Sequence, residues 1–137
     1  MSKIFAVYGA SGCGRSLMPV AVDQLQRLDA QADSQIVFID DALDKDTNVN
    51  GYTAMNYTRF KDLDSDDKFV LIAIANSVVR QTIADKLLQD GISLWSVQHD
   101  STLIMDAVKI DKGAALSPFV TIAANVTIGI CFHAILE

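Results

Sequence analysis

The chain has 137 residues, half of them hydrophobic, and a formal net charge of −6 at pH 7. This length suits one ordinary domain with a small appendage, and the apolar content excludes general disorder. The acidic balance argues against a nucleic-acid partner, because a protein that binds nucleic acid needs a basic patch to offset the phosphate charges.

The first predicted element is a buried strand that leads directly into a glycine-rich turn. Residues 4–8 are an apolar run, the spacing Gly-x-x-Gly-x-Gly follows at residues 9–14, and residues 16–28 have a helical period. Glycines let a ligand approach the main chain, and the first N–H groups of the following helix attract a phosphate. The pattern predicts a phosphate loop, although a tight turn without a ligand would also explain it. Its candidate residues are Gly9, Ser11, Gly12, Cys13, Gly14 and Arg15.

The next segment predicts a second buried strand and then an irregular region. Residues 35–39 are apolar and end at two aspartates, Asp40 and Asp41. Residues 42–67 are polar and contain turn signals, and within them residues 52–60 have room for a short strand and a helical turn. The two aspartates therefore lie at the carboxyl end of a strand.

A third strand, a helix and a fourth strand follow. Residues 68–74 are the most hydrophobic run of this half, and the helix after them begins at Asn76 or Ser77 and ends near Gly91. The fourth strand covers residues 93–97. The order strand, helix, strand, strand, helix, strand favours a small parallel sheet with helices on its faces.

Ligands of such sheets bind beyond the carboxyl ends of the strands, where three loops of this chain converge. Asp40 and Asp41 are candidates to accept a hydrogen bond from a ribose hydroxyl or a base N–H, and a solvated turn explains them equally well. Asn76 either contacts the ligand or caps its helix. Arg80 lies one helical turn further on, within reach of the phosphates or on the surface.

The last forty residues repeat every six positions. The aliphatic residues of the repeat are Ile104, Ile110, Leu116, Ile122 and Ile128. A second row, two places before the last four of these, is Val108, Ala114, Val120 and Val126, and Phe132 continues it. A six-residue period fits neither a helix nor an alternating strand, and it predicts a hexapeptide β-helix whose recurrent aliphatics point inward. About five faces of the triangular coil are expected.

Residues 113–136 contain no charged residue and are long enough to cross a bilayer. Polar residues are spread evenly through this window and no basic cluster flanks it, so we expect no membrane span.

The N-terminal apolar run has only five residues and no cleavage pattern follows it, so we expect a cytoplasmic protein. Cys13 and Cys131 lie far apart and do not form a metal spacing, so no metal is expected.

Taken together, these features resemble the bacterial sugar acyltransferases of the NeuD/PglD family, which includes sialic acid O-acetyltransferases and bacillosamine N-acetyltransferases. The matching segments are residues 8–14, 38–41 and 72–76 with Arg80, and the hexapeptides beginning near His99. The resemblance implies a Rossmann-like domain at residues 1–100 that binds a UDP-linked amino sugar. It also implies a left-handed β-helix from residues 101–137 that forms a homotrimer, binds acetyl-CoA between neighbouring coils and acetylates the sugar on nitrogen or oxygen in bacterial glycan biosynthesis.

Two departures from the family pattern affect this interpretation. The family usually has a histidine at the place of Cys13, so any role of that imidazole is lost. Family members also carry a Glu-His-Asp or Glu-His-Glu motif with the general base, and this chain stops at Glu137 before it. We therefore interpret the chain as a truncated form or N-terminal part of such an enzyme that is inactive alone. His133 is a weak substitute as a base, because it is not at the motif position.

Two other functions compete with this interpretation. The glycine loop also resembles that of NAD(P)- or CoA-binding Rossmann proteins, but neither Tyr52 nor Tyr57 has the lysine four residues later that short-chain reductases need. A non-catalytic module that only trimerises is the third possibility.

Overall fold

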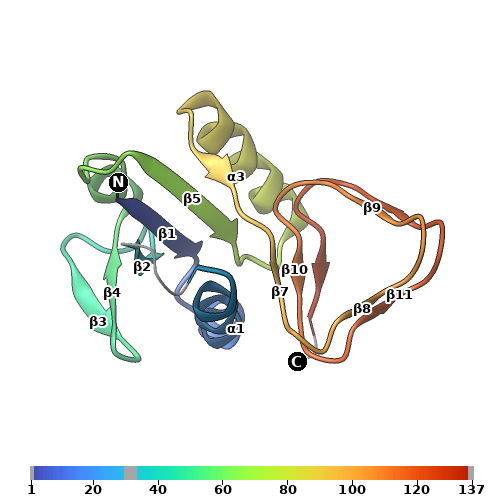
Figure 1. The fold of residues 1–137 in the computed structure, drawn as a ribbon. Coiled ribbons are helices and arrows are strands. Elements are labelled where there is room, and N and C mark those ends of the chain that lie inside the picture. The colour runs from blue at the N-terminus through green and yellow to red at the C-terminus, as the bar shows by residue number, and fades with distance from the viewer. Residues whose placement is uncertain (1, 30–33, 136–137) are drawn as a thin grey trace.

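The computed structural model describes residues 2–29 and 34–135, which form an open sheet with helices on both faces, joined to a triangular coil (Figure 1). The first half contains β1 (Lys3–Tyr8), α1 (Gly12–Asp29), β2 (Ser34–Ile39), β3 (Thr47–Val49), β4 (Tyr52–Met55), α2 (Tyr57–Lys61), β5 (Asp67–Ile72), α3 (Ser77–Gln89) and β6 (Ser93–Leu94). The coil contains β7 (Val97–Gln98), β8 (Leu103–Ile104), β9 (Lys109–Ile110), β10 (Ala115–Leu116), β11 (Thr121–Ile122), β12 (Thr127–Ile128) and β13 (His133–Ala134).

The sheet has the strand order β3-β4-β2-β1-β5-β6, with β1 near its centre. β1 pairs in parallel with β2 on one side and with β5 on the other, over its whole length. Among the described strands of this sheet, only β3 runs antiparallel to its neighbour. The predicted mixed α/β fold, a Rossmann-like unit followed by the start of a β-helix, is confirmed. The chain crosses from one side of β1 to the other between β4 and β5, which places the switch point of the sheet at the glycine turn.

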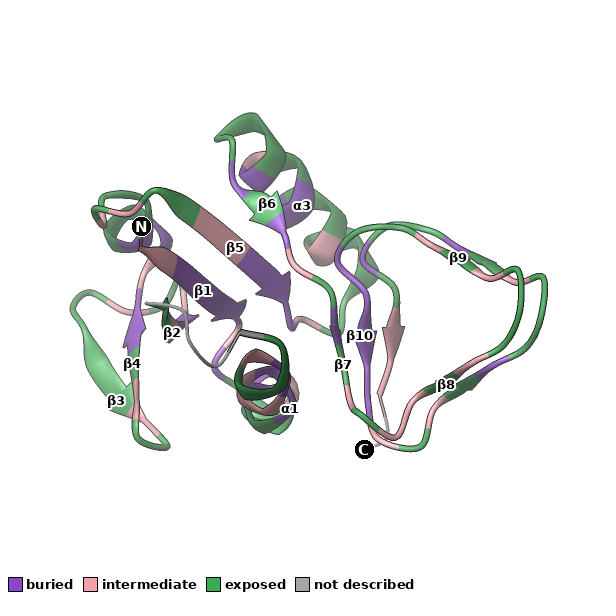
Figure 2. Cartoon of the chain, viewed as in Figure 1, coloured by how far each residue is buried: buried purple, intermediate pink, exposed green. Residues whose placement is uncertain are grey.

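Each face of the sheet packs against different elements. Because side chains alternate along a strand, Tyr8 points toward α2 and α3, whereas Val7 points toward α1. The α1 side continues into the coil, since Val97 and Ala115 belong to the same buried cluster as Leu17 of α1. Figure 2 shows the buried residues concentrated on the inner strands of the sheet and on β7 and β10 of the coil. Helix α1 therefore has the sheet on one side and the coil on the other.

The sequence did not predict the hairpin formed by β3 and β4. The sequence predicted an irregular region at residues 42–67, with room for a short strand and a helical turn at residues 52–60. That strand and turn are confirmed as β4 and α2. Asn50 and Gly51 both have positive φ, 52° and 90°, which is the conformation of a two-residue hairpin turn. The preceding strand was missed because its three residues are polar or half-exposed and carry no apolar pattern.

The expected fourth strand at residues 93–97 is two strands in different sheets. β6 pairs with β5 in the N-terminal sheet, and β7 pairs with β10 in the coil. Between them, the Trp95 N–H donates to the Val70 carbonyl, and the Ser96 hydroxyl accepts hydrogen bonds from the N–H groups of Gly113 and Ala114. The chain thus leaves one sheet and enters the other within two residues.

The coil has three walls, and β7, β8, β9 and β10 each pair with the strand eighteen residues further along. One wall is β7-β10-β13, and the others are β8-β11 and β9-β12. The described residues therefore contain two turns and one further strand, where the sequence predicted about five faces. The additional strands were missed because Gln98 and Ala134 stand at the six-residue positions in place of a large aliphatic.

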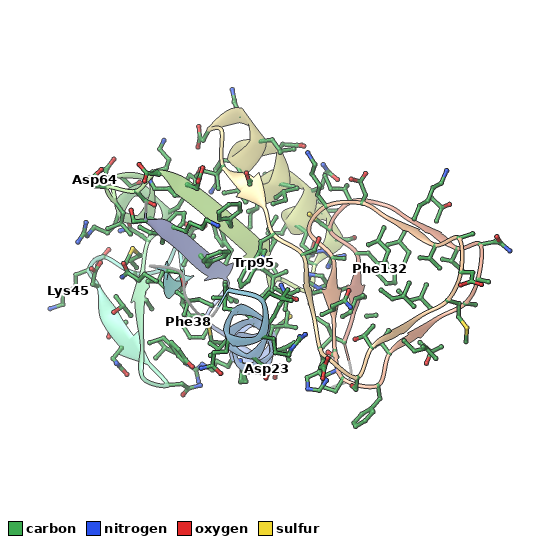
Figure 3. The ribbon with its side chains drawn as sticks, in the orientation of Figure 1. Asp23, Phe38, Lys45, Asp64, Trp95 and Phe132 are labelled. Atoms are coloured by element: carbon green, nitrogen blue, oxygen red, sulfur yellow. The ribbon has the colours of Figure 1, made fainter. Side chains whose placement is uncertain are left out.

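The inward row is confirmed at its centre, and left-handed residues recur along the coil. Leu116, Ile122 and Ile128 form a buried cluster inside it. Phe132, expected to continue the second row, lines a hollow of the coil together with Val120 and Val126 and is 40% exposed (Figure 3). Positive φ angles appear every six residues at the corners, at Ala107, Gly113, Phe119, Asn125 and Cys131.

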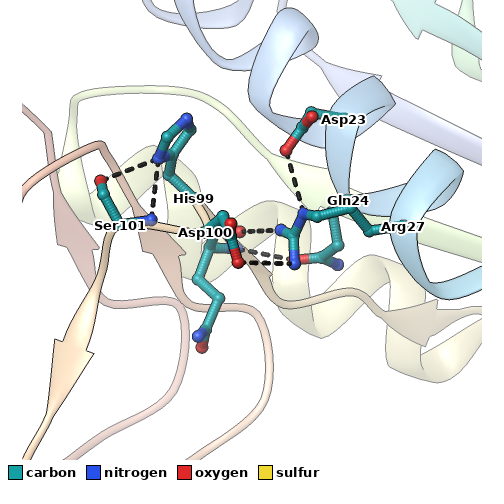
Figure 4. Close-up of polar contacts among 7 residues, drawn as sticks. Asp23, Gln24, Arg27, His99, Asp100 and Ser101 are labelled. Carbon is teal, nitrogen blue, oxygen red and sulfur yellow. Dashed lines mark hydrogen bonds and ion pairs between the residues drawn. The ribbon is translucent and has the colours of Figure 1, made fainter.

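Two side chains of α1 hold the coil in place (Figure 4). The Gln24 side chain, only 7% exposed, donates to the Ser96 carbonyl at 3.0 Å and accepts from the Gln98 N–H at 2.8 Å. Arg27 donates to the Gln98 carbonyl and forms an ion pair with Asp100. These contacts set the orientation of the coil relative to the sheet.

Candidate functional site: a cleft between the glycine turn and the coil

The glycines of the first turn have two different roles. A Cβ on Gly14 would lie 1.7 Å from the Gly9 carbonyl oxygen, and one on Gly9 would lie 2.8 Å from the Ala73 carbonyl oxygen. These two glycines allow the turn to pack against itself and against the end of β5. Gly12, the first residue of α1, has open space at its Cβ position within 4 Å. Gly12 is therefore the glycine that leaves main chain accessible to a ligand.

Two adjoining hollows lie between this turn and β13. The first, about 340 Å³, is lined by Gly12, Cys13, Ser16 and Ile135. The second, about 270 Å³, is lined by Cys13, Ala75, Arg80, His133 and Ile135. They share Cys13 and Ile135, so together they form one cleft. The N-terminal N–H groups and positive dipole end of α1 face it, which favours an anion.

The structure assigns two of the predicted polar residues to local structure. The Asn76 side chain caps α3, since its oxygen accepts from the N–H groups of Val78 and Val79 at 2.9 and 3.0 Å. The Arg15 side chain turns back and donates from Nε to the Ala10 carbonyl at 2.8 Å. A contact of either residue with a ligand stays a prediction.

Arg80 connects the sheet to the coil. Its Nη1 donates to the carbonyls of Ile74 and Ala75 in the loop after β5, and its Nε donates to the Cys131 carbonyl at the corner before β13. The guanidinium is half-buried and lines the second hollow. It gives the cleft a fixed positive charge next to the N-terminus of α1.

His133 is the other side chain that joins the coil to the sheet. Its Nε2 lies 2.7 Å from the Ile72 carbonyl, and since a carbonyl only accepts, Nε2 carries the proton. Burial lowers the pKa of His133, and the nearby Arg80 guanidinium lowers this pKa further against the opposing effect of the hydrogen bond. The imidazole is therefore neutral at pH 7 and lies on the wall of the cleft.

The two aspartates at the end of β2 line neither hollow, and their side chains have different partners. Asp40 accepts from the Ala42 N–H at 3.0 Å within its own turn. Asp41 accepts from the Tyr8 hydroxyl at 2.7 Å, and that hydroxyl accepts from Lys86 Nζ at 2.7 Å. The main chain keeps this strand end next to the glycine turn, because the Gly9 N–H donates to the Ile39 carbonyl. Asp40 and Asp41 thus follow a strand end next to the glycine turn, outside the two hollows.

Sequence reasoning missed Tyr8, Lys86 and Ile135. The position of Tyr8, the last residue of the central strand before the glycine turn, could have revealed it as a polar group at the ligand edge. Lys86 and Ile135 carry no such signal. Only the packing of α3 brings Lys86 to the Tyr8 hydroxyl, and only the packing of the coil brings Ile135 to the first hollow. In the described part of the chain, no group of three His, Cys, Asp or Glu side chains could hold a metal ion.

Fold and site together define a class: a Rossmann-like unit with an anion-attracting cleft that is closed on one side by a β-helix. Residues 4–87, more than half of the chain, match the family described as the PglD N-terminal domain. The chain belongs to this family, which confirms the resemblance noted from the sequence.

Relatives with known names are similar over nearly the whole chain. GDP-perosamine N-acetyltransferase of Escherichia coli O157:H7 is 32% identical over 132 residues, which are 96% of this chain and 59% of the relative. The structure of WeeI from Acinetobacter baumannii AYE is 42% identical with a TM-score of 0.88, over 96% of this chain and 60% of WeeI. This chain thus spans about three fifths of the length of these relatives.

A third similarity shows the fold alone. PerB from Caulobacter crescentus, solved in complex with CoA and GDP-perosamine, is 22% identical with a TM-score of 0.67, over 93% of this chain and 58% of PerB. Among residues 2–29 and 34–135, no helix is long and apolar enough to cross a membrane.

Proposed function

We propose that this chain is the sugar-nucleotide-binding part of an acetyl-CoA-dependent sugar N-acetyltransferase. The observation that carries the proposal is the cleft in which the open Gly12 and the N-terminus of α1 face Arg80 and β13. Such a cleft suits a diphosphate, because N–H groups and a guanidinium bind phosphate oxygens without any other cation. Membership of the PglD N-terminal family and the named activity of the Escherichia coli relative support this assignment.

In this proposal the parts of the ligand have separate places. The diphosphate lies at the first turn of α1, over Ser11, Gly12 and Cys13. The amino sugar extends into the hollow next to Arg80 and His133, and the nucleoside extends toward Asp40 and Asp41. Carboxylates are suited to that end, because ribose hydroxyls and base N–H groups are donors.

The nucleotide base is the finer part of the proposal. The sequence resemblance favours a UDP-linked amino sugar, whereas the Escherichia coli relative is named for GDP-perosamine and the PerB structure holds the same compound. We propose the shared class, a nucleoside-diphosphate-linked amino sugar, and a titration with both nucleotides separates the two bases.

The reaction itself requires acetyl-CoA, and it belongs to the proposal for the whole protein. By the resemblance, the β-helix assembles as a homotrimer in the cytoplasm and binds acetyl-CoA between neighbouring coils. The CoA in the PerB structure agrees with this cofactor. We assign no general base within this chain, because His133 does not stand at the motif position of the family's histidine.

Calorimetric titration tests the proposal with four ligands: a UDP-linked amino sugar, GDP-perosamine, NAD and CoA. We expect saturable binding of one sugar nucleotide and none of NAD. Binding of NAD without either sugar nucleotide would overturn the proposal and support the dinucleotide alternative.

A further inference from the structure

We infer that Tyr8, with Lys86 behind it, is a positioning residue that fixes the carboxylate of Asp41 for the nucleoside of the ligand. The inference rests on the proposed function, since Asp41 is there assigned to the nucleoside. It adds a task for three residues that lie outside the cleft and that no phosphate loop requires.

Burial fixes the position of the Tyr8 hydroxyl, and its two hydrogen bonds fix the direction of its proton. Its side chain is 1% exposed at the end of the central strand, packed among the residues beneath α2 and α3. Its oxygen accepts from Lys86 Nζ at 2.7 Å, so its single proton points to Asp41 Oδ2, also at 2.7 Å. A buried ring cannot rotate away, and the position of the carboxylate is thereby set by the core.

Lys86 strengthens this hydrogen bond from the far side. Its ammonium lies 4.2 Å from the centre of the Tyr57 ring and donates to the Tyr8 hydroxyl at 2.7 Å, so two aromatic side chains hold it in place. An ammonium that donates to a phenol oxygen polarises the phenol and makes its O–H a better donor. The charge of Lys86 therefore reaches Asp41 through Tyr8, and not by a direct ion pair.

The neighbouring residues show that this arrangement is specific to Asp41. Asp40 accepts from the Ala42 N–H in its own turn, which any aspartate in such a turn would do. Tyr57 offers a matched comparison, since its hydroxyl donates to a different carboxylate, Asp90, at 2.5 Å. Of these two tyrosines, it is Tyr8 whose hydroxyl connects the core to the sheet edge at which the ligand is proposed to bind.

The first test measures the affinity of the sugar nucleotide identified by calorimetry. Tyr8→Phe keeps the ring and removes the hydroxyl, and we expect it to raise Kd about tenfold, as for a lost hydrogen bond to a charged group. Lys86→Met should also raise Kd, but by less than Tyr8→Phe does. The control Tyr57→Phe removes an equivalent hydroxyl and should leave Kd unchanged. Thermal unfolding of each variant establishes that it is folded at the titration temperature.

A double-mutant cycle separates positioning from general packing. If Tyr8 acts through Asp41, Tyr8→Phe should have no further effect on Kd in the Asp41→Ala background. An equal loss of affinity in both backgrounds would overturn the inference, and so would an unchanged Kd in Tyr8→Phe.

A second measurement does not depend on any ligand. Three-bond NMR couplings of Asp41 should report one χ1 rotamer in the unaltered protein and rotamer averaging in Tyr8→Phe and Lys86→Met, with no change in Tyr57→Phe. One rotamer in all variants would contradict positioning even if the nucleotide binds. If no sugar nucleotide binds the unaltered protein, the proposed function fails, and the nucleoside role of Asp41 fails with it.

Discussion

At the scale of single residues, the three glycines of the first turn have different surroundings. Gly9 and Gly14 are required by the fold, because a Cβ at either would contact a main-chain oxygen at 2.8 or 1.7 Å. Gly12 has no such constraint and faces the cleft. Substitution of Gly9 or Gly14 should therefore affect stability, whereas substitution of Gly12 should affect ligand binding.

Gly12→Val should abolish sugar-nucleotide binding, with little change in the melting temperature. The branched side chain would occupy the space through which phosphates approach the first turn of α1. Gly14→Ala, in contrast, should destabilise the fold by more than about 1 kcal/mol, because its Cβ overlaps the turn. Calorimetry and thermal unfolding of both variants check this, and unaltered affinity in Gly12→Val would mean that the loop is only a turn.

A second residue-scale prediction concerns the corners of the coil. Phe119 has a φ of 65° and is 79% exposed, whereas Asn stands at the equivalent corner, 125. Asparagine adopts the left-handed region more readily than a bulky residue. We expect Phe119→Asn to stabilise the protein by about 0.5–1 kcal/mol, measured by urea unfolding.

The control for the corner prediction is Ala124→Gly. Ala124 precedes the left-handed Asn125 and does not itself have a positive φ. Glycine there should reduce stability, because it only adds freedom to the unfolded chain. Equal effects of the two substitutions would refute the role of backbone strain.

At the scale of elements, β13 is the strand by which the coil closes the cleft. Two contacts hold this end of the coil to the sheet: His133 Nε2 to the Ile72 carbonyl, and Arg80 Nε to the Cys131 carbonyl. The position of β13 therefore depends on contacts with the end of β5 and with α3 as well as on its own coil. Because one of these contacts is made by a titratable histidine, the stability of the protein should depend on pH.

We expect the free energy of unfolding to fall as the pH drops from about 7.5 to about 5.5, a range around the ordinary histidine pKa. The pKa of His133 is lowered in the folded protein by burial and by Arg80, so the unfolded chain binds a proton that the folded chain excludes. Its stabilising contribution is complete above the ordinary histidine pKa, near 6.5, and is lost as the pH falls toward the lowered pKa. Urea unfolding across this range, with His133→Gln as the comparison, measures the effect. The same pH slope in both proteins would exclude His133 as its source.

At the scale of the whole molecule, the coil is open at the β13 end within the described residues. A hollow of about 380 Å³ enters its apolar interior there, and Phe132 and Ile128 are among the side chains that line it. β11 and β12 each pair with only one strand in the described part of the chain. Strand edges and apolar interiors of this kind invite another chain.

We therefore expect the 137-residue chain to self-associate through this end and to sediment as a species larger than 14.9 kDa. Leaving such side chains in water forfeits about 1.5–3 kcal/mol each. Phe132→Asp should shift the population toward monomer. Phe119→Asp, at an outer corner, should not. A monodisperse monomer of the unaltered chain would refute the expectation, and equal dissociation by both variants would move the interface elsewhere.

The sequence alone determined the elements whose signal is local. The apolar run at residues 4–8, the glycine spacing at residues 9–14 and the helical period at residues 16–28 predicted a strand, a turn and a helix, because each signal lies in adjacent residues. The six-residue repeat predicted the β-helix, since an aliphatic that packs inside the coil recurs at one position in five successive strands. Asn76 was placed at a helix start for the same local reason, and the structure has it as the cap of α3.

The tertiary structure decided everything that depends on distant residues meeting. The five residues between 93 and 97 divide between two sheets because β5 and β10 each offer a strand edge, which no local pattern reveals. The partners of Asp41 and His133 lie 33 and 61 residues away, at Tyr8 and Ile72. Parallel sheets and coils pair strands that are far apart in the chain, so a hydrogen bond across them is fixed by packing and is invisible in the residues that make it.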